Sequence, residues 1–358
     1  QTDMFRTLAV TAPEQLVATL QSLPGLSNVV RDVPVRPACC DAPFSVESSF
    51  GIEAGLGTYI EAQAGGPQYT WEDFTVMEPD AIAYMRVPPG LTGACVRVAV
   101  IDTGVDSGHE ALRGAVVRKV PISSGNPEDG VGHGTHVAGS IAGQEVDSPR
   151  GPWHGVAPGA KIININVLDN EGNGKISDVI AGLDAAVRCK VDLVNMSLGA
   201  AVDFLVDPVA AAVEEVTRRG TLCVVAAGNF GPNPFTIGTP GSVGRALTVG
   251  AASTPIAGYL DGGLTAAFSS RGPTLRSIYK PDVAAPGGAG GRGQRPELIY
   301  GPSSGFLDSL IDGVPDGWAP LRGSSMATPH ITGLLALLME RYRFTRDDIE
   351  QAIQSTAR

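Results

Sequence analysis

The sequence has few charged residues, few aromatic residues and no long apolar run. Of its 358 residues, 18% are charged and 6% are aromatic, whereas 43% are hydrophobic, so the chain can bury a sizeable core. No apolar run reaches about 18 residues, and we therefore expect no membrane-spanning helix. The formal net charge is −11, and no basic run offsets it. This balance argues against nucleic acids and anionic membranes as partners.

Cysteines are few as well, and none of the five has the C-x-x-C spacing of a zinc site. Cys39 and Cys40 are adjacent, whereas Cys223 lies in an apolar run, where a thiol acts as a small hydrophobe. The sequence leaves open one or two disulfides without indicating their pairing. No signal-peptide pattern follows Gln1, so a leader was either removed or never present.

The chain divides into three parts by composition. Residues 1–37 contain a capped helical pattern at 11–20 and a strand-like run at 28–33, a small α+β segment that cannot bury a core alone. Residues 38–75 are rich in Gly, Ala, Ser and Pro, and their lack of periodicity indicates a linker. The main domain is expected at residues 76–358.

Short apolar runs alternate with helical patterns in this main domain. The five runs span residues 96–101, 161–167, 191–196, 222–226 and 246–250, and the clearest helical stretches are 176–188 and 208–219. Such alternation predicts an α/β fold, a doubly wound and mostly parallel sheet with helices on both faces. Functional groups in such sheets gather at the carboxyl ends of the strands.

Four polar residues stand where chemistry is expected in this arrangement. Asp102 ends the first apolar run, and Asn229 follows the fourth, where its amide could hold an oxyanion. His133 lies between glycines that leave room for an imidazole base, and we expect the small-residue helix that follows it to span residues 136–142. Ser325 precedes an apolar helix, whose amino end stabilises negative charge; proline 329 is expected in its first turn.

Each of these residues also has an ordinary structural interpretation. Asp102 could cap a turn, Asn229 could belong to a turn, and Ser325 could be an N-cap. His133 and His136 could ligate a metal, but no third ligand is near, and no metal site is predicted. An aspartic peptidase is excluded because the two Asp-x-Gly copies, at 102 and 106, are only four residues apart. A nucleotide site is disfavoured because these carboxylates stand where a pyrophosphate would bind.

Three segments together resemble the signature blocks of the subtilase family: residues 101–104 (IDTG), 133–139 (HGTHVAG) and 323–330 (GSSMATPH). The resemblance covers about residues 75–358 and implies a subtilisin-like serine endopeptidase that works through an acyl-enzyme. Ser325 would be the nucleophile, His133 the base and Asp102 its orienting acid. Asn229 and the backbone N–H of Ser325 would hold the oxyanion. A catalytically silent binding or regulatory module is the alternative, although all four residues are present.

The same resemblance implies a clamp for an extended peptide substrate. Its expected members are two backbone edges and the wall between them: Ser197, Leu198 and Gly199; Gly172, Asn173 and Gly174; and Ala226 and Gly228. Because these stretches carry no charged residue, we expect broad cleavage after apolar residues.

The N-terminal part and three departures complete the comparison with the family. Residues 5–35 resemble the second half of a subtilase propeptide, which implies a secreted, self-processing zymogen inhibited by its own N-terminal segment; a purely structural cap is the alternative. Ser324 replaces the usual threonine, which leaves the chemistry intact. Ala111 replaces an acidic calcium ligand; the sequence leaves a structural calcium open but identifies no site for it, and no cofactor is expected. Residues 287–320 form a longer segment than is typical, with no function legible in the sequence.

Overall fold

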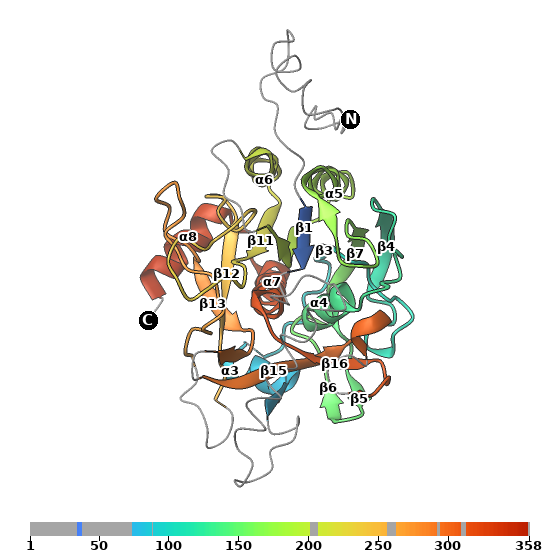
Figure 1. The fold of residues 1–358 in the computed structure, drawn as a ribbon. Coiled ribbons are helices and arrows are strands. Elements are labelled where there is room, and N and C mark those ends of the chain that lie inside the picture. Colours follow the sequence, from blue (N-terminus) through green and yellow to red (C-terminus); the bar gives the residue numbers. More distant parts are fainter. Residues whose placement is uncertain are drawn as a thin grey trace.

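The computed structural model describes residues 34–37, 74–87, 89–200, 207–255, 263–291, 294–308 and 313–356. Its centre is a seven-stranded parallel sheet in the order β13-β12-β11-β9-β3-β7-β4 (Figure 1). The strands are β3 (Arg97–Asp102), β4 (Val116–Pro121), β7 (Lys161–Asn166), β9 (Leu193–Met196), β11 (Leu222–Ala226), β12 (Leu247–Ala252) and β13 (Val283–Pro286). The predicted doubly wound α/β fold is confirmed, and each of the five apolar runs forms a strand.

Two layers of helices cover this sheet. The helices α5 (Ile176–Arg188) and α6 (Pro208–Arg218) lie on one face, and α4 (His133–Ala142) and α7 (Ser324–Arg341) lie on the other (Figure 1). A separate hydrophobic cluster fills the space on each face. None of the described helices is long and apolar enough to cross a membrane.

The strand order places a topological switch between β3 and β9. From β3 the chain builds β4 and β7 on one side, and from β9 it builds β11, β12 and β13 on the other. The loops that follow β3 and β9 therefore diverge from neighbouring strands, and this is where open α/β sheets bind their ligands. Asp102 ends β3 and Ser197 follows β9 directly, so two predicted site residues stand at the switch.

The long segment at 287–320 builds most of a second, smaller sheet. It comprises β14 (Ala289–Gly291), β15 (Gln294–Pro302) and β16 (Trp318–Leu321), and β2 (Thr75–Met77) pairs in parallel with β15. The helix α3 (Glu78–Tyr84) follows β2 and buries Glu78. Further elements of the described chain are η3 (Glu110–Leu112), β5 (Val146–Ser148), β6 (Gly151–Trp153), η4 (Gly305–Asp308) and α8 (Arg346–Thr356).

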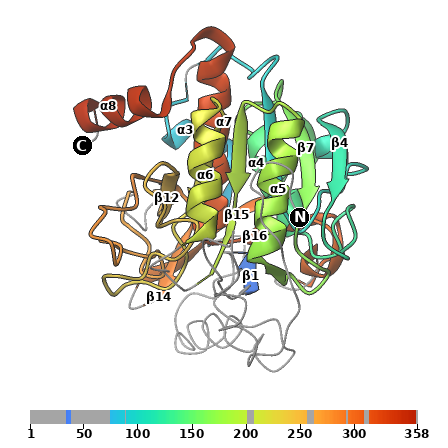
Figure 2. The ribbon, with the colours of Figure 1, turned by 90° about the horizontal axis from the view of Figure 1, so that it is seen from above.

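A short N-terminal strand, β1 (Pro34–Pro37), completes a three-stranded sheet. It lies between β10 (Leu198–Gly199) and β8 (Gly174–Lys175) and is antiparallel to both. In Figure 2, β1 lies at one end of the covering helices and α8 at the other. The predicted helix at 11–20 and strand at 28–33 lie outside the described residues, as does the linker up to residue 73; Thr75 already begins β2.

Three cysteines in the described part of the chain are free thiols, Cys95 at the surface and Cys189 and Cys223 in the interior. Burial raises the pKa of the Cys223 thiol to about 12. This agrees with its predicted role as a small hydrophobe, because a thiol with such a pKa stays neutral. Cys39 and Cys40 lie outside the described residues.

Candidate active site

Asp102 and His133 meet where β3 ends and α4 begins. Oδ1 of Asp102 accepts hydrogen bonds from Nδ1 of His133 and from the backbone N–H of Thr103, each at 2.7 Å. Both side chains of the pair are completely buried. The bond requires the hydrogen of the neutral imidazole to sit on Nδ1, so Nε2 keeps the lone pair that a base needs. The helix begins at His133, three residues before the predicted start at His136.

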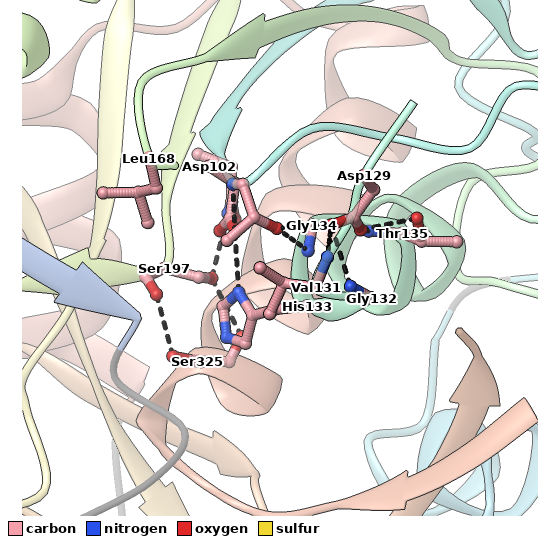
Figure 3. Close-up of polar contacts among 12 residues, drawn as sticks. Asp102, Asp129, Val131, Gly132, His133, Gly134, Thr135, Leu168, Ser197 and Ser325 are labelled. Carbon is pink, nitrogen blue, oxygen red and sulfur yellow. Dashed lines mark hydrogen bonds and ion pairs between the residues drawn. The ribbon is translucent and has the colours of Figure 1, made fainter. Parts of the chain in front are cut away.

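Ser325 is the second residue of α7, so its hydroxyl lies at the positive end of the helix dipole. Gly323 precedes the helix with φ 154°, a backbone conformation that favours glycine. The hydroxyl of Ser325 donates a hydrogen bond to the carbonyl oxygen of Ser197 at 2.9 Å. Figure 3 shows the imidazole of His133 between the side chain of Asp102 and Ser325.

Pro329 leaves one carbonyl of α7 without its usual helical hydrogen bond. It is the sixth residue of α7 and so lies in the second turn, not in the first turn as predicted. Proline has no N–H to donate to the carbonyl four residues earlier, which belongs to Ser325. That carbonyl oxygen instead accepts a hydrogen bond from the hydroxyl of Ser197 at 2.9 Å. Ser197 and Ser325 therefore bond reciprocally, side chain to backbone.

Asn229 is bound to the same helix end. Its Oδ1 accepts a hydrogen bond from the backbone N–H of Ser324 at 2.9 Å, and the Ser324 hydroxyl accepts one from the N–H of Gly228 at 3.1 Å. Because the amide oxygen of Asn229 faces Ser324, the orientation of its NH₂ group is fixed as well. The loop after β11 and the start of α7 thus hold the two groups predicted to stabilise an oxyanion.

Parts of the two predicted edges form the strands β10 and β8, and each pairs with β1. Arg36 and Pro37 of β1 pair with Gly199 and Leu198, and Val35 pairs with Gly174. Gly172 and Asn173 do not join this pairing. They form the turn before β8, in which Asp169 accepts hydrogen bonds from the N–H groups of Glu171 and Asn173 at 3.0 and 2.8 Å.

The wall between the edges contains a residue that the sequence did not reveal. Ala226 ends β11 and is buried, and Gly228 follows with φ 98°. A Cβ atom on Gly228 would lie 3.3 Å from Cδ2 of Phe230, so the aromatic ring of Phe230 lies against this glycine. Phe230 is 48% exposed, unusual for a large apolar side chain, and it extends the apolar lining that was expected here.

Asp129 is a second residue that sequence reasoning missed. Its carboxylate is buried and accepts five hydrogen bonds from the two loops that carry Asp102 and His133 (Figure 3). An aspartate four residues before the candidate base, in an Asp-Gly turn, was the available signal. Such a turn is common in loops, so the pattern alone could not separate this carboxylate from turn chemistry.

The position at which many relatives were expected to bind calcium does not fit a metal here. Ala111 is completely buried and packs in a cluster with Trp153, Tyr300 and Trp318. Neither its methyl group nor these aromatic neighbours offers an oxygen ligand of the kind that calcium takes. Within the described ranges, no group of three or more His, Cys, Asp or Glu residues could hold a metal ion.

The fold and these contacts define a doubly wound α/β domain with an Asp-His pair and a helix-terminal serine at the carboxyl edge of its sheet. The family model of the subtilases matches residues 93–358, and the chain belongs to this family. The predicted membership of the subtilase family is thereby confirmed.

Curated relatives agree with this assignment. The chain is 34% identical over 283 residues to the serine protease AprX of Bacillus subtilis, covering 74% of this chain and 62% of that protein. It is 32% identical over 289 residues to subtilisin of Bacillus pumilus, covering 78% of this chain and 91% of that protein. Among solved structures, a psychrophilic protease, S41, aligns with a TM-score of 0.59 and 31% identity over 74% of this chain and 84% of that chain.

Proposed function

We propose that the chain is a serine endopeptidase that cleaves extended peptide segments through Asp102, His133 and Ser325. The observation that carries the proposal is the buried Asp102–His133 pair, together with the extended strand β1 that lies between β8 and β10. Membership of the subtilase family supports the same reaction class. The antiparallel pairing of β1 on both sides supports a substrate recognised mainly through its backbone.

In the proposed first step, the hydroxyl of Ser325 turns from the Ser197 carbonyl to Nε2 of His133. Its oxygen attacks the scissile carbonyl carbon while its proton passes to Nε2, and Asp102 stabilises the resulting imidazolium. The carbonyl electrons move onto oxygen, where the Asn229 NH₂ group and the Ser325 N–H hold the negative charge. Collapse breaks the C–N bond, and His133 gives its proton to the leaving amine.

The second step returns the enzyme to its starting state. Water attacks the acyl carbon of the ester on Ser325, and His133 takes one proton from that water. Collapse of the second tetrahedral intermediate releases the carboxylic acid and returns the proton to the oxygen of Ser325. Asn229 and the helix dipole of α7 act in both halves because each passes through an oxyanion at the same place.

The test of this assignment is Ser325→Ala, which removes one oxygen from a completely buried site. We expect hydrolysis of a peptide substrate to fall by at least about 10⁴, because the covalent route is lost. Binding of a non-cleaved peptide and the far-UV circular dichroism spectrum should stay those of the parent. Residual activity within tenfold of the parent contradicts the assignment. A parent that is neither active nor labelled by a fluorophosphonate at Ser325 favours the silent module.

The side-chain preference is proposed from the wall of the clamp. Ala226, Gly228 and the ring of Phe230 present no charge to the residue before the scissile bond. We therefore expect cleavage after apolar residues, with charged residues rejected because their desolvation has no compensating partner there. A peptide-library profile dominated by Lys or Arg at that position contradicts this preference.

The position of β1 between β8 and β10 supports a zymogen in which the N-terminal segment is both inhibitor and first substrate. Arg36 and Pro37 occupy the edge formed by β10, which begins directly after Ser197. We propose that the chain is cut within the few residues that follow Pro37. Parent protein should acquire a new N-terminus at residues 39–42 by mass spectrometry, whereas the Ser325→Ala variant should stay intact. A parent that is fully active without this cut makes β1 a structural cap.

A secreted location belongs to the same proposal, because a zymogen delays proteolysis until the protein has left its site of synthesis. Fractionation of the native host, followed by detection of the processed chain outside the cells, tests it.

A further inference from the structure

We propose that Asp129 is a positioning residue that fixes the segment carrying the base His133 to the loop that follows the acid Asp102. This inference rests on the function proposed above. Asp129 is only 2% exposed. Five donors reach its carboxylate: to Oδ1, the Thr103 hydroxyl at 2.8 Å and the N–H groups of Val131 and Gly132 at 3.1 and 2.8 Å; to Oδ2, the N–H and hydroxyl of Thr135 at 2.8 and 2.7 Å.

These bonds join the two loops on both sides of the base. Gly132 and Thr135 bracket His133 in the sequence, and Thr103 follows the acid Asp102. The Thr103 hydroxyl donates to Asp129 and accepts a hydrogen bond from the N–H of Gly134 at 2.9 Å. A shift of the backbone around His133 relative to the loop after Asp102 would therefore break bonds to Asp129 or to Thr103.

The local sequence explains why this segment needs hydrogen bonds from a residue such as Asp129. Glycines flank His133, and they allow close packing: a Cβ atom on Gly134 would lie 2.0 Å from the carbonyl oxygen of Gly104. Glycines offer no side chain of their own to hold the loop, and their backbone is the most permissive. Asp129 itself has φ 68°, a conformation that costs a non-glycine residue energy and persists where surrounding bonds enforce it.

The long segment at 287–320 also forms hydrogen bonds with the residues that precede His133. The hydroxyl of Ser304 donates to the backbone oxygen of Asp129 at 3.1 Å, and its oxygen lies 3.2 Å from the hydroxyl oxygen of Thr135. The N–H of Leu307 donates to the carbonyl of Val131 at 3.0 Å. The segment whose role the sequence left open thus packs against the loop that carries the base.

The experiment replaces Asp129 by asparagine in the full chain, with Asp106→Asn as the matched control. Asp106 lies in the same region, but its carboxylate bonds the nearby N–H of Gly108 across a partly exposed turn. For Asp129→Asn we expect kcat to fall about 10²-fold, the scale of a misplaced catalytic group, with KM within about twofold. None of the five bonds to the Asp129 carboxylate involves β8 or β10, and this explains the expected split. Asp106→Asn should leave both constants unchanged.

Thr103 supplies an independent arm. Thr103→Val removes the hydroxyl that bridges Asp129 and Gly134, and Thr103→Ser keeps it. We expect Thr103→Val to lower kcat at least tenfold and Thr103→Ser to restore it, because bridging needs only the hydroxyl. In the Asp129→Asn/Thr103→Val double variant, the losses should be less than multiplicative, since both act through one network.

A spectroscopic readout separates this inference from the peptidase assignment. The Nδ1 proton of His133, bonded to Asp102, gives a far-downfield ¹H resonance that does not require turnover. We expect Asp129→Asn to broaden or lose it and Asp106→Asn to retain it. A retained resonance with kcat within twofold of the parent overturns the inference. If Asp129→Asn does not fold, unchanged kcat and resonance in Thr103→Val overturn it instead. An inactive parent with an intact resonance counts against the proposed function alone.

Discussion

The two helical layers of the molecule differ in what they bury. In the outer layer, eight of the thirteen residues of α5 and five of the eleven of α6 are buried, so each helix keeps a solvent face. In the inner layer, all ten residues of α4 are buried, including His133, Thr135, His136 and Ser140. The helices of the outer layer are amphipathic, whereas α4 of the inner layer places polar side chains inside the core.

The inner polar groups are satisfied by specific partners from other elements. The hydroxyl of Thr332 in α7 donates to Oδ1 of Asn195 in β9 at 2.7 Å, and Nε2 of His136 bonds the carbonyl of Ile299 in β15 at 3.1 Å. Such bonds are costly to leave unmade in a dry interior, so they define one relative position of the helices. We infer that the inner layer fixes catalytic geometry and the outer layer supplies stability.

The largest effect should come from Asn229, which lies in the loop after β11 and bonds the start of α7 in the inner layer. We expect Asn229→Ala to lower kcat by about 10² to 10³ with little change in KM, because the amide acts mainly on the transition state. Steady-state kinetics on a peptide substrate measures both constants. Asn233→Ala, an exposed asparagine of the same loop, is the control. A raised KM at unchanged kcat would instead make Asn229 a ground-state binder.

Leu183 tests the opposite layer. It is completely buried in the core beneath α5. We expect Leu183→Ala to lower the free energy of unfolding by about 2–5 kcal/mol, through lost transfer energy and the cavity left behind. Denaturant unfolding on the Ser325→Ala background avoids self-digestion. In the active chain, kcat measured well below the unfolding transition should match the parent. A large loss of kcat in folded enzyme would show that the layers do not divide their roles.

The sequence predicted the outer layer better than the inner one for a physical reason. The predicted 176–188 helix matches α5 in both bounds, and 208–219 differs from α6 by one residue, because one-sided burial leaves a clear apolar period. A fully buried helix has no such period. The start of α4 was therefore placed at His136 instead of His133, and Pro329 was assigned to the wrong turn of α7.

The candidate site shows the same division. The sequence predicted four candidate residues because each lies in a distinctive local sequence beside a strand or helix end: Asp102, His133, Asn229 and Ser325. Asp129 was missed because its importance comes from a tertiary contact with Thr103. Phe230 was missed because its exposure and its position against Gly228 depend on how this loop folds. The second sheet was missed as well. Its β15 pairs with β2, which lies more than two hundred residues earlier in the chain. No local sequence pattern predicts a pairing between such distant strands.

A buried acid between the inner helices and α3 gives a third, smaller effect. Glu78 Oε1 lies 3.2 Å from Nε2 of His330, and both side chains are completely buried. The carbonyl of Met326 accepts from Nδ1 of His330 at 2.7 Å, so Nδ1 carries a hydrogen. Burial raises the pKa of Glu78 to about 8, an effect that contact with Ser140 only partly offsets, and burial lowers the pKa of His330 to about 4. At neutral pH the pair is therefore uncharged.

The sign of the pH dependence follows from these directions. The folded chain holds the Glu78 proton while the unfolded chain releases it near 4.5, so this group lowers stability progressively from pH 4.5 to about 8. His330 acts oppositely, because its depressed pKa makes stability fall as pH drops from 6.5 to about 4. The neighbouring His136, whose pKa burial lowers to about 3, also stays neutral above pH 6.5. Between pH 6.5 and 8, only Glu78 of these three groups contributes.

Glu78→Gln should therefore flatten the stability profile on the alkaline side. Between pH 6.5 and 8, we expect the parent to lose about 1–2 kcal/mol more than the variant, because the amide cannot ionise. Urea unfolding at both pH values, again on the Ser325→Ala background, measures the difference. Glu145→Gln, at an exposed glutamate, should keep the parental slope. A parental slope in Glu78→Gln would show that the acid is paired as an ion.

The smallest effect should come from the most visible ion pairs of the outer layer. Glu215 of α6 accepts hydrogen bonds from Arg218 at 2.8 and 2.7 Å and from Arg219 at 2.6 Å, and the Arg218 bonds are the main reason that its pKa falls to about 2. A depressed carboxyl pKa gives stability that is present above pH 4.5 and lost as pH falls toward 2. However, the guanidinium side chains are 71% and 45% exposed, so water and salt screen the attraction, and ordering three flexible side chains offsets what remains. We therefore expect the unfolding midpoint of Glu215→Gln to equal that of the parent at pH 7 in 0.15 M salt. A loss comparable to that of Leu183→Ala would mean that the outer layer depends on its charges as well as on its apolar face.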